Sequence, residues 1–443
     1  MLNNQNNILF NSFMINNNKN YKNRTIFSKI WQEIDNDKII LLNGARQVGK
    51  TTLMKMVKEK LMSEKNVSQN QILWFDLERT GDLADWDKQI DALNVLPIKD
   101  VSNKYYLFID EFQRASEIGS TLKVIHDHYP HIKPIITGSA SWYLNIDESM
   151  AGRKTVIKIW PLSFQEFLQW KQDDEIARRA SMLAENKRLP SAFVDIANNK
   201  LLDFLAFGGY PETVLADGKS TRRQILNDLI NSYLTRDIKI WNYAANTLQV
   251  KKLLSLLAAQ IGGLLNQQTL SINTELGRTA LQNRLELLQN TFILYFIQPY
   301  FTNKIKEIAK NPKIYLADTG LRNALLNNFS IMPQTPEFGK MTENFVVMEL
   351  LKNPDNAFMM DGAVNFWRTR QKQEVDIILR RENKLIPIEV KGGNCLKIPS
   401  GLKSFIRQYE PETAYVLNWS IIKDEQCKNC QVLFRPLWFA DKI

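Results

Sequence analysis

The fold of this chain is decided by one stretch, Ile39-Ile40-Leu41-Leu42-Asn43-Gly44-Ala45-Arg46-Gln47-Val48-Gly49-Lys50-Thr51. Its first four residues form a short apolar run, which is typical of a buried parallel strand. The part from Gly44 to Thr51 fits the pattern G-x-x-x-x-G-K-[ST] at every fixed position. Residues that favour a helix follow from Thr52 onward. The stretch therefore predicts a strand, a phosphate-binding loop and a helix, in that order.

Each fixed residue of this loop has a chemical reason to be there. Gly44 and Gly49 let backbone N–H groups curl around phosphates without a side chain in the way. The positive end of the following helix faces the same anion. Lys50 would bring a charge to the β- and γ-phosphates of ATP, and the Thr51 hydroxyl would ligate Mg²⁺. The predicted nucleotide-binding residues are Gly44, Ala45, Arg46, Gln47, Val48, Gly49, Lys50, Thr51 and Thr52.

Apolar runs at 72–75, 105–109, 134–137 and 155–159 predict four further strands. Helical segments separate the strands, so the first third of the chain is expected to be an α/β domain with a parallel sheet. In such a sheet the ligand lies at the carboxyl ends of the strands.

Polar residues near the ends of these runs complete a predicted catalytic site. Asp110 would hold the Mg²⁺ through water, and Glu111 would act as general base on the attacking water. Thr137, or Ser139 just after it, would orient that water; the alternative is a Ser-rich turn. Arg153 would touch the γ-phosphate of its own site or of a neighbouring copy, unless it is an ordinary surface arginine. The candidate catalytic residues of this part are Lys50, Glu111, Thr137 and Arg153.

Composition excludes several classes of protein. The chain has 443 residues, of which 44% are hydrophobic and 23% charged, and these are ordinary globular values. No apolar stretch reaches the roughly 18 residues of a membrane-spanning helix, so no membrane contact is expected. Three cysteines cannot form a disulfide framework, which favours the cytoplasm. Residues 1–24 contain ten Asn and predict a disordered tail.

The net charge of +10 is distributed unevenly along the chain. Residues 1–240 carry 32 basic and 29 acidic groups, whereas residues 241–443 carry 25 and 18, a net charge of +7. A positive surface attracts phosphate backbones, so this excess weakly indicates DNA binding through residues 246–443. The alternative is that the charge serves only solubility.

The middle of the chain predicts helices. By resemblance to AAA+-type ATPases, which carry a small helical lid at this place, residues 161–245 are expected to form a lid over the nucleotide. Arg236 would sense the nucleotide or pair with a carboxylate. Residues 246–310 have the order helix, short helix, glycine turn, helix and strand, which is the outline of a winged helix-turn-helix. Structural packing or protomer contact is the alternative to DNA reading. In a DNA-binding version the last helix would carry four residues on or near its exposed face: Thr279, Gln282, Asn283 and Arg284.

The last third carries a second phosphate-handling pattern. Asp376 is followed thirteen residues later by Glu389, and Lys391 lies two residues further on, within predicted strands. Asp376, Glu389 and an accessory Glu343 would bind Mg²⁺, which prefers oxygen ligands and would activate a water. Lys391 would position that water or help to deprotonate it. This spacing predicts a PD-(D/E)xK nuclease-like domain, and the alternative is a solvated strand edge without catalytic function.

Together these motifs resemble a group of prokaryotic AAA+-superfamily ATPases. The resemblance covers about residues 24 to 420 and implies a P-loop domain joined to a C-terminal domain with a restriction-endonuclease-like fold. The motifs that carry it are the phosphate-binding loop, Asp110-Glu111, Thr137-Gly138-Ser139, Ala151-Gly152-Arg153, Trp160 to Phe167, Gly208 to Glu212, Tyr233 to Ile238 and Ile314 to Leu321.

The predicted fold class is α/β: an AAA+-like P-loop parallel sheet, a helical lid and a winged helix, then an α/β restriction-endonuclease-like domain. We predict a Mg²⁺-dependent ATPase whose nucleotide cycle controls a DNA-facing nuclease-like domain. The alternative is a nucleotide-gated switch that binds DNA or protein and whose nuclease-like domain is inactive. A second copy of the chain or another protein is a further candidate partner. The expected segments are 1–24 (tail), 25–160 (ATPase core), 161–245 (lid), 246–310 (winged helix) and 311–443 (nuclease-like domain).

Overall fold

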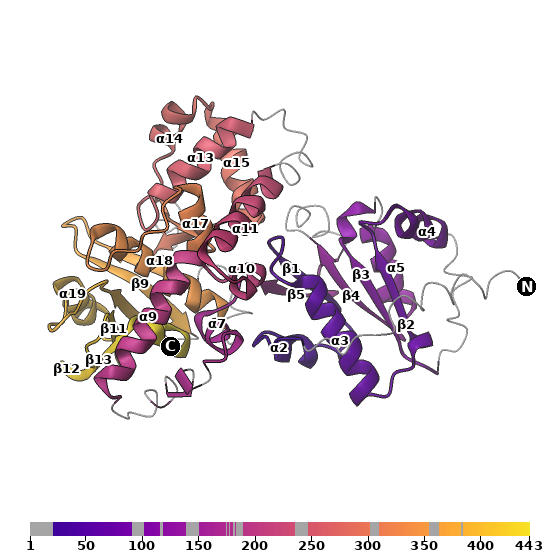
Figure 1. Ribbon diagram of the computed structural model, residues 1–443, viewed down its shortest axis with the longest axis horizontal. Coiled ribbons are helices and arrows are strands. Elements are labelled where there is room, and N and C mark those ends of the chain that lie inside the picture. The colour runs from indigo at the N-terminus through magenta and orange to yellow at the C-terminus, as the bar shows by residue number, and fades with distance from the viewer. Residues whose placement is uncertain are drawn as a thin grey trace, which may run out of the picture.

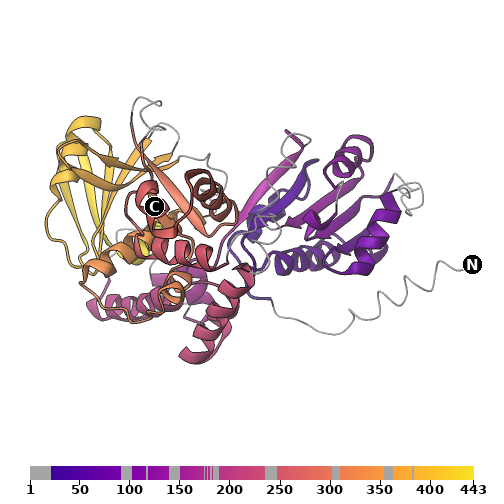
Figure 2. The same cartoon turned by 90° about the horizontal axis from the view of Figure 1, so that it is seen from above.

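A computed structural model shows a chain with two lobes (Figure 1). The first lobe contains the N-terminal parallel sheet and its helices, and the second contains the rest of the chain (Figure 2). One cluster of buried apolar side chains extends through both lobes, so their cores are continuous. The described residues are 21–90, 102–115, 118–138, 150–173, 175–176, 178–179, 182, 189–234, 247–301, 310–353, 363–381 and 384–443.

The first lobe is built on a five-stranded sheet in which every pair of neighbouring strands is parallel. The strand order is β2-β3-β4-β1-β5. All five strands lie where the apolar runs predict them. Their bounds are β1 Ile39–Gly44, β2 Ile72–Asp76, β3 Tyr105–Asp110, β4 Ile132–Gly138 and β5 Lys154–Ile159.

Helices cover both faces of this sheet. Ile40 and Leu42 of β1 lie in the apolar cluster that includes α3, whereas Ile39 and Leu41 lie in the cluster that includes α5. This alternation follows from the pleat of a strand, which turns successive side chains to opposite faces. The helices of the lobe are α2 Phe27–Gln32, α3 Lys50–Glu64, α4 Thr80–Ile90 and α5 Ile118–His128, with short 3-10 turns at Gln69–Gln71 and Phe112–Arg114.

The second lobe begins with a helical layer. Helix α9 packs on α17 and α18, and Asn198 in α9 donates a hydrogen bond to the Trp419 carbonyl (2.9 Å). The helices α13, α14 and α15 lie close to the residue ranges that the sequence predicts to be helical. The bounds in this lobe are α7 Phe164–Trp170, α9 Ser191–Phe207, α10 Pro211–Leu215, α11 Lys219–Ser232, α13 Thr247–Ala259, α14 Gln267–Thr274, α15 Arg278–Asn290, α17 Thr319–Leu325, α18 Pro336–Lys352, α19 Ser400–Tyr409 and the 3-10 helix Leu437–Lys442.

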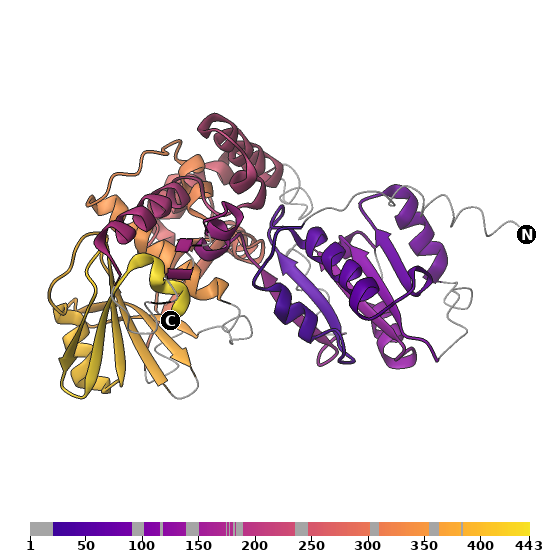
Figure 3. The same cartoon turned by 60° about the horizontal axis from the view of Figure 1, so that its bottom comes forward.

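A mixed eight-stranded sheet forms the other half of the second lobe (Figure 3). Its order is β12-β13-β11-β10-β9-β8-β6-β7, and it contains both parallel and antiparallel pairs. Strand β6 pairs with both β7 and β8, so the strands that follow α15 continue directly into the C-terminal sheet. The bounds are β6 Leu294–Pro299, β7 Lys313–Leu316, β8 Val364–Arg368, β9 Glu374–Arg381, β10 Lys384–Val390, β11 Thr413–Asn418, β12 Lys423–Cys427 and β13 Cys430–Pro436.

Two sequence-based expectations need correction. The tail was expected to reach residue 24, yet Arg24 is buried and bonded to the phosphate loop, so the boundary lies too late. Arg284 was expected on the exposed face of α15, but it is buried and donates to the Ala280 carbonyl, while Thr279 and Gln282 are exposed. Arg236 and Ser139 lie outside the described residues. Among the described helices, none is long and apolar enough to cross a membrane.

Candidate nucleotide site and acidic cluster

The phosphate loop joins β1 to α3 at the carboxyl edge of the first sheet. Gly49 has a φ of 95°, in the region that favours glycine, and directly precedes α3. A Cβ on Gly44 would come within 2.2 Å of the Ile159 carbonyl oxygen, so β5 also requires a glycine there. The two fixed glycines are therefore explained by backbone conformation at one position and by close strand packing at the other.

Lys50 is buried at the mouth of this loop. Its Nζ donates hydrogen bonds to the carbonyl oxygens of Gly44 (3.0 Å) and Ala45 (2.8 Å). These two bonds hold the ammonium group beside the amides of the loop, where a bound anion would lie.

Asp110 brings three of the predicted site residues together. Its Oδ2 accepts a hydrogen bond from the Thr51 hydroxyl at 2.6 Å, and its Oδ1 accepts one from the Thr137 hydroxyl. These residues come from α3, β3 and β4, whose ends meet because the strands are parallel. A hydroxyl and a carboxylate in contact are oxygen ligands of the kind that Mg²⁺ prefers, so this pair fits the metal.

Glu111 follows Asp110 in a left-handed backbone conformation, with φ of 53°. Burial raises the pKa of its carboxyl group, and the charges of Lys50 and Arg46 oppose that shift. Gln113, which sequence reasoning did not single out, donates a hydrogen bond to Glu111. A buried carboxylate with a raised pKa is suited to accept a proton near neutral pH.

Arg24 is a second residue of this site that the sequence pattern missed. Its guanidinium group donates to the carbonyls of Val48 and Trp160 (both 2.9 Å) and to Glu166 (3.0 Å). Although burial alone would raise the pKa of Glu166, the charge of Arg24 and backbone amides lower it. The sequence does contain a signal for Glu166, the partner of Arg24, because Ser163 and Glu166 match the pattern of a capping box and form one at the start of α7.

Arg153 does not lie at the nucleotide site of its own chain. It directly precedes β5, and its carbonyl accepts a hydrogen bond from Ile39 at the start of β1. The phosphate loop begins five residues further along β1, about 16 Å away along the strand. The Arg153 side chain pairs with Asp127 at 2.7 Å. The predicted own-chain contact with the γ-phosphate is therefore wrong.

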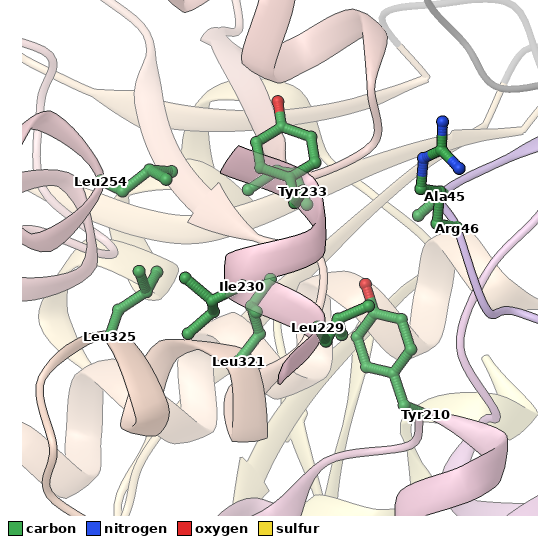
Figure 4. Close-up of a pocket in the computed structure, with 10 residues that line it drawn as sticks. Ala45, Arg46, Tyr210, Leu229, Ile230, Tyr233, Leu254, Leu321 and Leu325 are labelled. Carbon is green, nitrogen blue, oxygen red and sulfur yellow. The ribbon is translucent and has the colours of Figure 1, made fainter. Parts of the chain in front are cut away.

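A small pocket separates the phosphate loop from the helical layer of the second lobe (Figure 4). Ala45 and Arg46 lie on one side of it, and Tyr210, Leu229 and Ile230 lie on the other. Within the segment expected to be a lid, α9 packs on α17 and α18, whereas Tyr210, which directly precedes α10, and α11 adjoin the loop.

The four residues of the second pattern also converge. Glu343 lies on α18, Asp376 on β9, and Glu389 and Lys391 at the end of β10. The Asp376 carboxylate accepts a hydrogen bond from the Val390 amide at 2.8 Å, and Lys391 donates to Glu389 at 2.7 Å. The acidic cluster, as we call Glu343, Asp376 and Glu389, therefore lies where α18 crosses the C-terminal sheet.

Burial and mutual repulsion dominate the titration of this cluster. Burial, together with the charge of Asp376, raises the pKa of Glu389 to about 8 although Lys391 opposes the shift. Burial likewise raises the pKa of Glu343 to about 7 against the opposing charge of Lys313. Crowded carboxylates of this kind need a cation nearby to remain ionised.

Sequence reasoning missed two residues that contact Glu343 of this cluster. Lys313 pairs with Glu343 at 2.9 Å and with Glu374 at 2.6 Å, and Tyr315 donates to Glu343 at 2.6 Å. Within the described ranges, no group of three or more His, Cys, Asp or Glu side chains is arranged to hold a metal ion. The carboxylates as arranged here therefore do not fit the Mg²⁺ that the motif predicts.

Curated relatives of the chain carry no functional description. An uncharacterized protein of Haemophilus influenzae is 24% identical over 416 residues, which cover 87% of this chain and 94% of the relative. An uncharacterized protein of Methanocaldococcus jannaschii is 27% identical over 364 residues, which cover 79% of this chain and 73% of the relative.

Two solved structures match the chain with low TM-scores. The structure of C. elegans PCH-2 has a TM-score of 0.26 and 14% identity, and the match covers 59% of this chain and 65% of that one. A DNA polymerase III gamma subunit-related protein from Thermotoga maritima has a TM-score of 0.25 and 14% identity, and the match covers 60% of this chain and 97% of that one. We draw no functional conclusion from scores this low.

Family models match three parts of the chain. Residues 36–168 match the model described as an AAA domain. Residues 198–331 match a domain of unknown function (DUF8612), and residues 338–434 match another (DUF4143). None of these three descriptions names a nuclease. The chain thus carries an AAA-type P-loop ATPase domain, the kind that binds and hydrolyses ATP, followed by two domains without an assigned function.

Proposed function

We propose that this protein is a Mg²⁺-dependent ATPase whose nucleotide cycle controls a DNA-facing, nuclease-like second lobe. One observation carries the ATPase half: the Thr51 and Thr137 hydroxyls both donate to Asp110, while Lys50 lies at the mouth of the same loop. Thr51 and Asp110 would hold the Mg²⁺, which would neutralise charge on the phosphates during transfer.

The chain's own residues account for the remaining steps of hydrolysis. Lys50 would bind the β- and γ-phosphates. Glu111 would accept the proton of the attacking water, and Gln113 would hold its carboxylate in place. Thr137 would help to orient the water from the end of β4.

A buried network supports the proposed control of the second lobe. Arg24 links the Val48 carbonyl of the phosphate loop to Glu166 of α7. One residue after the cap of α7, the Phe164 amide donates to Glu349 of α18 at 2.8 Å. Glu343 lies six residues from Glu349 on that helix, which corresponds to a rise of about 9 Å. A shift of the phosphate loop would therefore reach the acidic cluster through α7 and α18.

Contact of the second lobe with DNA is part of the proposal and rests on charge. The net +7 of residues 241–443 and the exposed Thr279 and Gln282 of α15 support it. A second copy of the chain or another protein is the competing partner for this surface. A salt-dependent binding curve separates these cases, because phosphate contacts release counterions.

A second candidate function is a nucleotide-gated binding switch whose nuclease-like domain does not cut. The observation that favours it is Lys313, whose ammonium group pairs with Glu343 and Glu374. Under this proposal Glu111→Gln would trap an ATP-bound complex with a partner, and the DNA would stay whole.

Parallel assays on three proteins test both candidates. ATP hydrolysis and DNA cleavage are measured for the wild type, Lys50→Ala and Asp376→Ala. We expect Lys50→Ala to abolish ATP turnover and Asp376→Ala to leave it intact. Unchanged turnover in Lys50→Ala would refute the ATPase proposal. Absence of cleavage by the wild type at every ATP and metal concentration would refute the nuclease reading and leave the binding switch.

A further inference from the structure

The acidic cluster of the second lobe contains a cation that does not belong to its own motif. The Lys313 side chain is only 4% exposed, and its Nζ lies 2.9 Å from Glu343 Oε1 and 2.6 Å from Glu374 Oε1. The lysine therefore forms ion pairs with two carboxylates, one of which, Glu343, belongs to the acidic cluster.

Lys313 enters the cluster from a different part of the chain. It begins β7, whereas the acidic residues lie on α18, β9 and β10. Strand β7 is held against the turn after α13, since the Gly262 amide donates to the Ile314 carbonyl at 2.8 Å. A Cβ on Gly262 would lie 3.4 Å from Glu343 Oε2, so this turn packs closely on the cluster.

Tyr315 reinforces the same placement. Side chains two residues apart on a strand share a face, and the Tyr315 hydroxyl donates to Glu343 Oε1 at 2.6 Å. Glu343 Oε1 therefore accepts hydrogen bonds from two groups of one strand. An oxygen engaged in this way has little capacity left for a metal ion.

The opposite side of the cluster has an unsatisfied oxygen. Glu389 Oε1 accepts a hydrogen bond from Lys391 at 2.7 Å, but Oε2 is buried and has no hydrogen-bond partner among the described residues. A buried carboxylate oxygen without a donor costs free energy. This oxygen is an independent sign that the cluster is built to receive a further positive group.

We propose that Lys313 is the resident cation of the acidic cluster and that it excludes a divalent metal ion while β7 stays in place. This proposal rests on the hypothesis that the second lobe is nuclease-like, and it says how metal binding at the acidic cluster is regulated. Two cations in one small site repel each other, so a metal ion enters only when the ammonium group leaves. Glu343, Asp376 and Glu389 then become free to act as oxygen ligands.

Mn²⁺ binding to the full chain without nucleotide tests this proposal, with free Mn²⁺ measured by electron paramagnetic resonance. In the wild type we expect no Mn²⁺ site that Asp376→Asn removes. Lys313→Met, which keeps most of the length of the side chain and removes its charge, should create one site that binds Mn²⁺ at least about tenfold more tightly than the wild type does at the acidic cluster. Adding Asp376→Asn to Lys313→Met should abolish that site.

Lys352→Met is the matched control. Lys352 is likewise a buried lysine, and it pairs with Glu349 on α18 at 3.1 Å, outside the acidic cluster. It should create no Mn²⁺ site. If the wild type binds Mn²⁺ at a site that Asp376→Asn removes, or if folded Lys313→Met gains no site, the proposal is wrong.

Two further measurements keep the outcomes separate. If Lys313→Met does not fold, Lys313→Gln replaces it, and the comparison of wild type with Asp376→Asn still tests exclusion directly. ATP hydrolysis is measured on the same samples, because Lys313 lies outside the nucleotide site. If Lys50→Ala loses ATP hydrolysis but Lys313→Met gains no Mn²⁺ site, only the inference about Lys313 is refuted. If Lys50→Ala keeps ATP hydrolysis and Lys313→Met gains a Mn²⁺ site, only the ATPase proposal is refuted.

Discussion

The protein has two sets of carboxylates, and they differ in what binds them. At the phosphate loop, Asp110 accepts hydrogen bonds from the neutral hydroxyls of Thr51 and Thr137, while Lys50 bonds backbone carbonyls. In the acidic cluster, ammonium groups bond the carboxylates directly, Lys313 to Glu343 and Lys391 to Glu389.

This difference decides which set can accept Mg²⁺ without rearrangement. A hydroxyl beside a carboxylate can itself become a ligand, so the first arrangement needs little change. An ammonium group in contact with a carboxylate occupies the oxygen and adds repulsion toward a metal ion. Similar residue types therefore contact neutral hydroxyl groups in one lobe and ammonium groups in the other.

The largest effect that we expect comes from Glu111→Gln at the phosphate loop. The comparison of the two sets of carboxylates would fail if a matching change in the acidic cluster had the same effect on ATP hydrolysis. Without the general base, ATP hydrolysis should fall by about 10² to 10⁴-fold while ATP binding persists. Phosphate release and binding of a fluorescent ATP analogue measure the two quantities. Glu389→Gln is the control and should leave hydrolysis unchanged; equal losses in both variants would contradict separate roles.

Arg24→Met tests whether the buried pair with Glu166 holds the phosphate loop to the second lobe. Removal of one partner leaves a buried carboxylate unpaired, so the free energy of unfolding should fall by about 3–5 kcal/mol. Urea denaturation of the first cooperative transition measures this loss. The exposed pair of Lys384 and Glu412 supplies the control, since Lys384→Met should cost less than about 1 kcal/mol.

The pH dependence of stability tests Glu349, which lies between the two carboxylate sets. Burial raises its pKa from 4.5 to about 7, although Lys352 opposes the shift. The folded state therefore binds more protons than the unfolded state between these values, so the free energy of unfolding should fall as the pH rises from about 4.5 to 7. Urea denaturation across this range should show a shallower fall in Glu349→Gln. An identical slope in the variant would assign the dependence to other groups.

Arg153→Ala should have the smallest effect. Because Arg153 lies at the opposite edge of the sheet and pairs with Asp127, ATP hydrolysis should change by less than about twofold. The assay is run over a range of protein concentrations. A large loss confined to high concentration would instead show that Arg153 acts on a neighbouring copy, and the comparison would then have to include a second chain.

Much of the first lobe could be predicted because its signals are local. The run from Ile39 to Thr51 specifies a strand, a loop and a helix within thirteen residues, and backbone conformation alone explains Gly49. Asp110 and Glu111 were found because the strand that precedes them is a continuous apolar run. The role of Arg24 could not be predicted because it follows an Asn-rich segment and its partner Glu166 lies 142 residues away in the chain.

The sequence by itself determined which residue types are present for phosphate chemistry: the loop from Gly44 to Thr51, the pair Asp110-Glu111, and the pattern Asp376, Glu389 and Lys391. It did so because strand and loop patterns depend on near neighbours in the chain. Only the tertiary structure decided which of these carboxylates are free to act. Strand pairing places Arg153 at the amino-terminal end of the parallel strands, away from the phosphate loop. It also brings Lys313 of β7 to the acidic cluster. Contacts between segments this distant in the chain cannot be recognised from a local sequence pattern.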